Sequence, residues 1–363
     1  MNKLAFLVIL LFGLHAVTSA QEQRGVSLAE VLEAALGRHP SLRIAQARLE
    51  AATGRADELR SGYFPQLRVS GRAAYLSDVP EFGLPFISQP LFPSIRSSYG
   101  ARLSVQQNLF TGFRLNGSVN MAEANASAQL HDYERDRSEF VLNVTMAYWN
   151  LYRAERIVEV LKQSVDQVSA HVADVRRFRN QGLATEADVL KVETQLSEIT
   201  VRSIQARGNL KIAQMNLNSL IGRPLEASVH PSDHPFADTL RTTALDLTTI
   251  IQTARSRRPE VAAMEQRKVM QDAALTAANA GWYPSVMVSA NLDYARPNPR
   301  IIPPKDQWET TWDIGVQLQW NIWDWSATAA QADQARAQLT QAEAALDQVH
   351  DAVALEAAQS YFT

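Results

Sequence analysis

The sequence contains no cysteine and little glycine or proline, with 15 of each among 363 residues. Without cysteine there can be no disulfide framework, no thiolate zinc site, no catalytic thiol and no lipid-modified N-terminal cysteine. An excess of one charge sign is also lacking, because the formal net charge is only −3. A protein that binds nucleic acid or another polyanion would carry a basic excess. The composition therefore excludes disulfide-rich scaffolds and argues against a polyanion-binding protein.

Long apolar runs are missing too, except for one at the N-terminus. Lys3 precedes an apolar run over residues 4–14, and Thr18, Ser19 and Ala20 are the small residues of a cleavage site. The run is shorter than the roughly 20 residues that cross a bilayer as a helix. We expect residues 1–20 to be a signal peptide rather than a buried helix, and the mature protein to be exported.

The prolines reveal an internal duplication. The spacing between Pro40 and Pro65 is the same as the spacing between Pro259 and Pro284. A shift of 219 places residues 62–64 (Gly-Tyr-Phe) on residues 281–283 (Gly-Trp-Tyr), and a shift of 213 places residues 108–110 (Asn-Leu-Phe) on residues 321–323 (Asn-Ile-Trp). Two matches in register predict a repeat. We expect a first repeat over residues 21–223, a linker over 224–246 and a second repeat over 247–363.

Each repeat contains two segments of alternating apolar and polar residues, which predict β-hairpins at 66–110 and 285–323. Strands of roughly ten residues with one apolar and one polar face are typical of membrane barrels, although a soluble antiparallel sheet has the same pattern. Aromatic side chains at the strand ends suit membrane-interface girdles; they are Tyr75, Tyr99, Phe110, Tyr294, Trp312 and Trp323. In a barrel the polar faces would line the lumen, with the charged residues Arg68, Arg72, Arg102, Asp293 and Asp313.

The stretch from Ser94 to Arg223 has no proline, and its apolar residues recur at steps of three and four. A short segment around Gly182 interrupts this pattern. Sustained heptads on both sides of a glycine turn predict an antiparallel coiled-coil hairpin over residues 112–222. Its first arm would span on the order of 100 Å at 1.5 Å per residue.

Four strands per chain cannot close a barrel, because single-chain barrels have at least about eight strands. Open sheet edges are not tolerated in lipid. If these strands cross a membrane, the chain must therefore oligomerise, and three chains would supply twelve strands.

These residues resemble the TolC-like outer-membrane efflux proteins. The resemblance covers nearly the whole mature chain and rests on the duplicated aromatic-Pro segments, on the Asn-Leu-Phe and Asn-Ile-Trp strand exits, and on residues 177–190 (RFRNQGLATEADVL). It implies an α+β membrane protein, in which a long antiparallel α-helical coiled-coil barrel adjoins four β-strands per chain that contribute to a trimeric 12-stranded outer-membrane β-barrel.

The resemblance also implies a function. The homotrimer would be the channel-tunnel of a tripartite efflux or type I secretion system, a passive exit duct for small molecules or proteins. Its partners would be a periplasmic adaptor (membrane fusion protein), an inner-membrane pump and outer-membrane lipid. Its place would be the outer membrane of a Gram-negative bacterium, extending into the periplasm.

In this family the hairpin tip meets the adaptor. The resemblance implies that role for Arg177, Phe178, Gly182, Leu183, Thr185, Asp188, Val189 and Leu190. The same residues also have structural explanations, since Gly182 permits the turn and Thr185 caps the following helix with Asp188 as its third residue. The two interpretations are compatible.

The sequence departs from the family pattern at its end. The shift of 213 places Thr363 on Asn150 and leaves residues 151–221 without a counterpart. By family expectation the chain is C-terminally truncated, without the second hairpin of each subunit and without the constriction of the periplasmic mouth. We therefore expect this chain alone to be leaky or poorly folded.

The sequence also leaves other functions open: a soluble periplasmic coiled-coil adaptor or structural protein, a non-functional truncated fragment of the channel and, least favoured, an exported enzyme. Catalytic and metal-binding patterns are weak. His230 and His234 flank Pro231, which disfavours a helix that would present both to one metal. The sequence has no HExxH, no nucleophile elbow and no phosphate-binding glycine loop. We expect no catalytic residue, no metal and no cofactor.

Overall fold

A computed structural model of the chain describes residues 25–78, 80, 94–234 and 246–362. The predicted signal peptide, most of the loop after residue 78 and half of the predicted linker lie outside the described residues. The chain forms two compact units, each built from two separate stretches. The hairpin unit comprises residues 1–44 and 136–243, and the strand unit comprises residues 45–135 and 244–363. These units cut across the repeats, whose limits stay a prediction.

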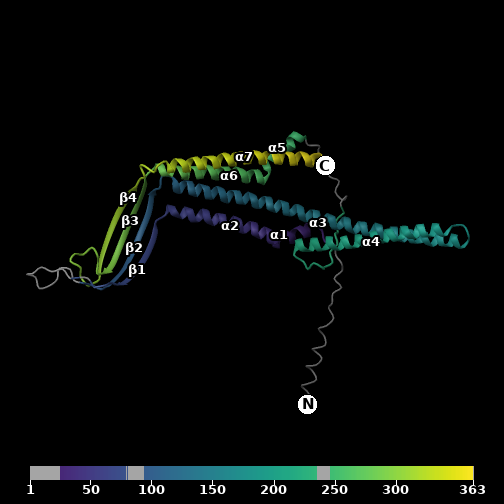
Figure 1. The fold of residues 1–363 in the computed structure, drawn as a ribbon, viewed down its shortest axis with the longest axis horizontal. Helices are drawn as coiled ribbons and strands as arrows, with labels where there is room; N and C mark the ends of the chain where they lie inside the picture. Colours follow the sequence, from purple (N-terminus) through teal and green to yellow (C-terminus); the bar gives the residue numbers. More distant parts are fainter. Residues whose placement is uncertain (1–24, 79, 81–93, 235–245, 363) are drawn as a thin grey trace, which may run out of the picture. The chain divides into compact units, whose positions relative to one another are not determined.

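One series of elements occurs twice along the chain (Figure 1). The first series is α1 (Leu28–Arg38), α2 (Pro40–Arg60), the 3-10 helix η1 (Ser61–Tyr63), β1 (Gln66–Tyr75), β2 (Ser97–Phe110) and α3 (Arg114–Asn180). The second is α5 (Leu247–Arg257), α6 (Pro259–Ala278), η2 (Asn279–Trp282), β3 (Ser285–Arg296), β4 (Glu309–Gln319) and α7 (Ala327–Phe362). Helix α4 (Glu186–Ile221) lies between the two series and follows α3. The four predicted strands and the long helices are confirmed.

The two series build the same corner where a strand enters a helix. Gly112 and Phe113 are left-handed, with φ of 62° and 69°, and their equivalents in the second series, Trp325 and Ser326, have φ of 54° and 68°. A side-chain oxygen then caps the helix in each case. Thr111 Oγ1 accepts from Leu115 N at 3.1 Å, and Asp324 Oδ2 accepts from Thr328 N at 2.8 Å.

A glycine packs against each of these corners. A Cβ on Gly62 would lie 3.0 Å from Leu115 Cδ1, and a Cβ on Gly281 would lie 2.4 Å from Thr328 Oγ1. Gly281 therefore permits an approach that no other residue would allow without displacing Thr328. Leu115 and Thr328 are equivalent positions of the two series. The contact of the glycine with this position therefore holds the end of the preceding helix in both series.

The hairpin unit has a buried core between α3 and α4. Val144, Tyr148, Leu151 and Leu217 are each 0% exposed, and α1 contributes Val31 to the same cluster. The apolar positions that step by three and four along α3 from Ala154 to Val175 are all buried or half-buried, as the heptads predict. The predicted capping box at Ser27 is present too, with Glu30 N donating to Ser27 Oγ at 3.3 Å.

The segment after α4 returns to the N-terminal segment of the hairpin unit. Val26 and Pro231 form a parallel β-bridge, and Leu28 N donates to Asp233 Oδ2 at 2.7 Å. The buried Tyr148 hydroxyl lies 3.0 Å from Val26 O and 3.1 Å from Asp233 Oδ2. Burial raises the pKa of Tyr148, so the phenol stays protonated and able to donate. Tyr148 thereby ties the start of α1 and the end of this segment to α3.

The strand unit contains one antiparallel sheet in the order β1-β2-β3-β4. Helices α6 and α7 of the same unit are joined by an ion pair between Lys268 and Glu343 at 3.2 Å. Strand β4 ends at Gln319, so the prediction that the hairpin continues to residue 323 is wrong for the single chain. Gln319 pairs with Ser285, the first residue of β3, and Pro284 before it has no backbone N–H to offer a further strand residue.

Candidate functional site

The pairing register sorts the side chains of the sheet onto two faces. One face holds apolar rows, such as Val69–Leu103–Leu292–Trp312 and Leu67–Val105–Ala290–Ile314. The other holds polar rows, such as Arg68–Ser104–Asn291–Asp313 and Ser70–Arg102–Asp293–Thr311. The register brings together on this polar face all of the residues predicted to face a lumen: Arg68, Arg72, Arg102, Asp293 and Asp313.

The apolar face stays exposed in the single chain. Trp312 is 70% exposed, and Ile314 and Val316 are each 69% exposed. In a soluble antiparallel sheet such a face would pack on a second layer and lose most of this exposure. Contiguous apolar surface of this kind marks contact with lipid or with protein.

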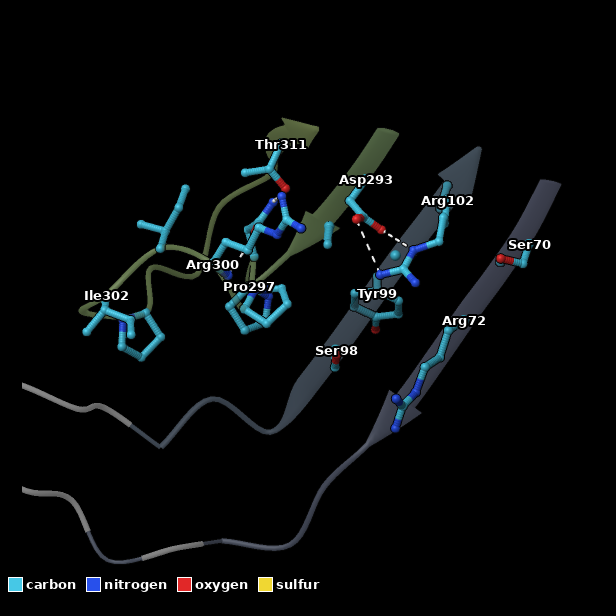
Figure 2. Close-up of a pocket in the computed structure, with 18 residues that line it drawn as sticks. Ser70, Arg72, Ser98, Tyr99, Arg102, Asp293, Pro297, Arg300, Ile302 and Thr311 are labelled. Atoms are coloured by element: carbon cyan, nitrogen blue, oxygen red, sulfur yellow. Dashed lines mark hydrogen bonds and ion pairs between the residues drawn. The ribbon is translucent and has the colours of Figure 1, made fainter. Parts of the chain in front are cut away.

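The polar face carries ion pairs across its strands. Arg102 forms a two-pronged contact with Asp293, with Nε 2.6 Å from Oδ1 and Nη2 3.3 Å from Oδ2 (Figure 2). Asp313 accepts from Asn291 Nδ2 at 2.9 Å and from Arg300 Nη2 at 2.6 Å. Within the described part of the chain, no ion pair joins Arg68 or Arg72, both on β1. The polar face therefore combines neutralised pairs with two free guanidinium groups at one edge.

The connection between β3 and β4 folds against this polar face. Its residues 297–304 and the adjacent strands enclose an open hollow of about 690 Å³, with Arg72, Arg102 and Asp293 on its strand side (Figure 2). Asn298 is 1% exposed and fastens the loop, because its Nδ2 donates to Glu309 O at 3.0 Å and to Thr311 Oγ1 at 3.1 Å. Arginine, aspartate and hydroxyl groups line the hollow together with proline and isoleucine side chains of the loop.

Asn298 and Arg300 were not found by sequence reasoning. Arg300 Nη1 donates to Trp312 O at 2.9 Å, which adds a second tie between the loop and β4. The only signal in the sequence is the proline content of residues 297–304, which predicts a loop but not the direction in which it folds.

Aromatic side chains gather at both ends of the sheet. At the loop end, Trp308 stacks on Tyr294 with ring centres 4.7 Å apart and lies 6.3 Å from Tyr99. At the helix end, Phe113 makes edge contacts with Phe110 at 5.3 Å and Tyr283 at 5.4 Å. The sequence did not predict Trp308, Phe113 and Tyr283 as members of these aromatic groups, because they lie just outside the strands.

Two of the predicted girdle aromatics do not lie at strand ends. Trp312 is inside β4, since β3 continues to Arg296 and its Ala295 pairs with Glu309. Trp323 lies beyond the end of β4. Tyr75 is the last residue of β1, as predicted.

The tip of the hairpin unit is a tight turn between α3 and α4. Gly182 has a φ of 75°, a left-handed conformation that favours glycine. Leu183 N donates to Phe178 O at 2.9 Å, and Gly182 N donates to Arg179 O at 3.0 Å, which satisfies carbonyls at the end of α3. Ion pairs then join the arms, Arg179 with Glu186 at 2.7 Å and Arg176 with Glu193 at 2.6 Å.

Thr185 and Asp188 form a capping box at the start of α4, as predicted. Asp188 N donates to Thr185 Oγ1 at 3.2 Å, and Thr185 N donates to Asp188 Oδ2 at 2.9 Å. The hydrogen bonds from Thr185 lower the pKa of the Asp188 carboxyl. Asp188 therefore stays charged at the positive end of the α4 dipole.

The residues predicted to meet an adaptor divide into two groups. Arg177, Phe178, Leu183 and Leu190 are exposed, with Leu183 the most exposed apolar residue of the four at 73%. Arg177 also pairs with Asp174. Val189 is only 4% exposed, as its structural explanation by packing predicts, and its adaptor role stays a prediction. It supports the tip from inside, as Gly182, Thr185 and Asp188 do through the turn and the cap.

Among the described residues, no three or more His, Asp or Glu side chains are grouped in a way that could hold a metal ion. His230 instead pairs through Nδ1 with Glu155 Oε1 at 2.7 Å. None of the helices in the described ranges is long and apolar enough to cross a membrane.

Comparison with known proteins decides the family. The family model described as "Outer membrane efflux protein" matches residues 31–223 and 250–363, which is most of the chain. The chain belongs to the outer membrane efflux protein family. Outer membrane protein TolC of Escherichia coli is 23% identical over 217 residues, 60% of this chain and 42% of that protein. Protein CyaE of Bordetella pertussis is 22% identical over 339 residues, 93% of this chain and 68% of that protein.

Solved outer membrane efflux protein structures share the fold. The outer-membrane channel OprN matches with a TM-score of 0.77 at 20% identity, over 92% of this chain and 73% of that chain. The outer membrane protein VceC of Vibrio cholerae matches with a TM-score of 0.74 at 19% identity, over 89% of this chain and 75% of that chain. This likeness shows that the chain has the fold of these proteins. The chain spans about half the length, 42% to 53%, of the first curated relatives that it matches.

Proposed function

We propose that the chain is an outer-membrane channel of a tripartite efflux or type I secretion system. It acts as a homotrimer in the outer membrane of a Gram-negative bacterium, where three copies of the sheet close a 12-stranded barrel and the helices extend into the periplasm. The channel is a passive exit duct for small molecules or proteins, and it receives them from an inner-membrane pump through a periplasmic adaptor.

The observation that carries this proposal is the two-faced sheet. Its strands are 10 to 14 residues long, which suits the roughly 9 to 11 residues that cross a bilayer. The apolar face is exposed, while the opposite face collects arginine and aspartate side chains in hydrogen-bonded rows. Hydrocarbon on one side and a water column on the other satisfy both faces at once. A soluble periplasmic adaptor does not need a sheet with an exposed apolar face.

The exposed part of the hairpin tip supports the role of adaptor contact. Phe178, Leu183 and Leu190 present apolar side chains beside the charged Arg177 on a rigid, capped turn. A docking surface of this composition resembles the core of a protein interface, in which aromatic residues and arginine are enriched. The free arginines of β1 in turn support a polar lumen.

The full chain, expressed with its export signal, tests the proposal. We expect SDS-resistant, heat-dissociable trimers in the outer-membrane fraction and ion conductance when they are placed in planar bilayers. Arg72→Glu should shift the ion selectivity toward cations, because it reverses a charge in the water column. The matched variant Arg43→Glu, which changes an exposed arginine of the hairpin unit, should leave the selectivity unchanged. A soluble periplasmic pool without trimers would contradict the proposal and favour the adaptor alternative.

The tip is tested separately with a photo-reactive residue. Placed at Leu183, it should cross-link to the periplasmic adaptor, whereas the same residue at Ile204, exposed on the α4 shaft, should not. Equal capture at both positions would refute a specific role for the tip.

A further inference from the structure

We infer that the hollow between the β3–β4 connection and the polar face of the sheet is a binding site for a small organic anion. The ligand places its anionic group on Arg72 of β1 and its apolar part against Ile302 of the connection. This inference rests on the proposed function and deepens it, because a polar face that lines an exit duct meets the solutes that leave through the duct. Three features of the hollow carry it: the floor, the charges and the wall away from β1.

The floor of the hollow is a gap in one polar row of the sheet. In this row Arg72 on β1 pairs with Gly100 on β2, and Gly100 pairs with Ala295 on β3. In the neighbouring row the same two inner strands carry the large side chains of Arg102 and Asp293. Because glycine and alanine leave space above the strands, a hollow of about 690 Å³ remains, which falls within the roughly 300–1,000 Å³ of small-molecule sites.

The charges that line the hollow leave one guanidinium free. Asp293 is held by Arg102, with Nε 2.6 Å from Oδ1 and Nη2 3.3 Å from Oδ2. Arg300 is held by Asp313, with Nη2 2.6 Å from Oδ1. Within the described ranges the side chain of Arg72 makes no hydrogen bond and no ion pair. Its N–H groups are therefore available to a carboxylate, which a guanidinium can bind through two parallel hydrogen bonds.

The side of the hollow away from β1 is apolar (Figure 2). Ile302 is 75% exposed, and three prolines of the connection line the hollow beside it. Asn298 and Arg300 fasten the connection to β4, so this wall is already in place before a ligand arrives. An apolar group that contacts the wall removes apolar surface from water. An anion with an apolar part thus meets both sides of the hollow, whereas an inorganic anion meets only Arg72.

The same groups disfavour a cation. Asp293 is the only carboxylate in the lining, and a cation could reach it only by displacing Arg102. Displacement would leave the Arg102 guanidinium without its partner, which is costly. Arg72 would in addition repel the cation. The hollow therefore distinguishes two ligands of the same shape by the sign of their charge.

Titration calorimetry of detergent-solubilised trimers of the full chain tests the site with 2-naphthoate. We expect saturable binding of 2-naphthoate and none of 2-naphthylmethylammonium, which has the same apolar part and the opposite charge. Arg72→Gln should weaken the binding of 2-naphthoate roughly tenfold, as expected for the loss of a hydrogen-bonded charge. Arg68→Gln is the matched control, because Arg68 also lies on the polar face of β1 without an ion pair but does not line the hollow.

A second variant, Gly100→Val, fills the floor and changes no charge. A Cβ at Gly100 would lie 3.5 Å from Ala295 Cβ, an ordinary contact, so the strand can accept a side chain there. This variant should abolish the binding of 2-naphthoate and leave the amount of SDS-resistant trimer unchanged. Binding that survives both Arg72→Gln and Gly100→Val, or that Arg68→Gln weakens as much as Arg72→Gln does, would overturn the site. Equal binding of the ammonium compound would overturn it as well.

Planar bilayers show from which side the anion comes. The long polar helices cannot cross a bilayer, so trimers added to one chamber keep their helices on that side. We expect 2-naphthoate on the helix side to reduce the conductance of the unchanged protein more than that of Arg72→Gln. A reduction from the loop side alone would identify a solute of the medium and overturn its export. Conductance without binding would overturn the site and keep the channel proposal, whereas binding without conductance would do the reverse.

Discussion

The core of the hairpin unit and the sheet of the strand unit differ in how far their apolar side chains are buried. The hairpin unit buries Val144, Tyr148, Leu151 and Leu217 completely within the single chain. The strand unit leaves apolar residues on the outer strands of its sheet exposed, such as Leu67 on β1 and Ile314 on β4, while Val105 and Ala290 between them are half-buried. The hairpin unit therefore has a core of its own, and the helices of the strand unit also bury Ala263 and Val353, whereas the apolar face of the sheet depends on its surroundings for stabilising contacts.

This difference separates two sources of stability in one chain. A buried leucine in the hairpin unit is stabilised by its neighbours, and its loss leaves a cavity wherever the protein happens to be. An exposed valine on the sheet gains nothing until lipid covers it. Different measurements should consequently detect substitutions in the hairpin core and substitutions on the sheet.

The largest effect is expected in the hairpin core. Leu217→Ala removes a side chain that is 0% exposed among Val144, Tyr148 and Leu151, at a cost of about 2–5 kcal/mol. Hydrogen exchange of the α4 backbone amides should accelerate accordingly in the detergent-solubilised protein. Leu190→Ala is the matched control, because Leu190 is exposed near the tip. Similar acceleration by both variants would contradict the expected difference between the buried and the exposed leucine.

A somewhat smaller effect is expected on the sheet, and it should depend on the face. Val316→Arg places a charge on the apolar face, which costs about 2–4 kcal/mol at the middle of a bilayer. Gln319→Arg places the same charge on the polar face of the same strand and should be tolerated. The amount of SDS-resistant trimer in outer membranes measures both. Equal loss of trimer would show that this face does not meet hydrocarbon.

The smallest effect is expected at the tip, where the α4 cap responds to pH. The folded pKa of Asp188 is lowered, so the cap contributes fully above the ordinary aspartate pKa of about 3.9 and is lost as pH falls through the lower, folded value. Amides in the first turn of α4 should open more readily over that acidic range, after correction for intrinsic exchange. Asp188→Asn should remove the pH dependence, and its persistence in this variant would exclude the cap as the cause.

Much of the fold could be predicted because local chemistry agrees with the global arrangement. Neighbouring residues are enough to predict the alternation along β1 to β4, the heptads on both sides of Gly182 and the Thr185 cap. The faces of the sheet could be predicted as well, since side chains alternate strictly along a strand.

The rest depends on contacts that are distant in sequence. The end of β4 at Gln319 is decided by where β3 begins, and the sequence of β4 itself continues its alternation past that point. The inward fold of residues 297–304 depends on Asn298 reaching Glu309 and Thr311. The burial of Val189 depends on the facing helix. Periodicity within one segment contains none of this information.

The paired corners at Thr111 and Asp324 are the same joint made from different atoms, a hydroxyl in one and a carboxylate in the other. Hydrogen bonding to Thr328 lowers the pKa of Asp324, so that joint weakens only in strong acid, while the joint at Thr111 has no proton to gain. In a closed ring of three copies the six joints would alternate around the circumference. Protonation of Asp324 would then act on every second joint and leave the joints at Thr111 unchanged.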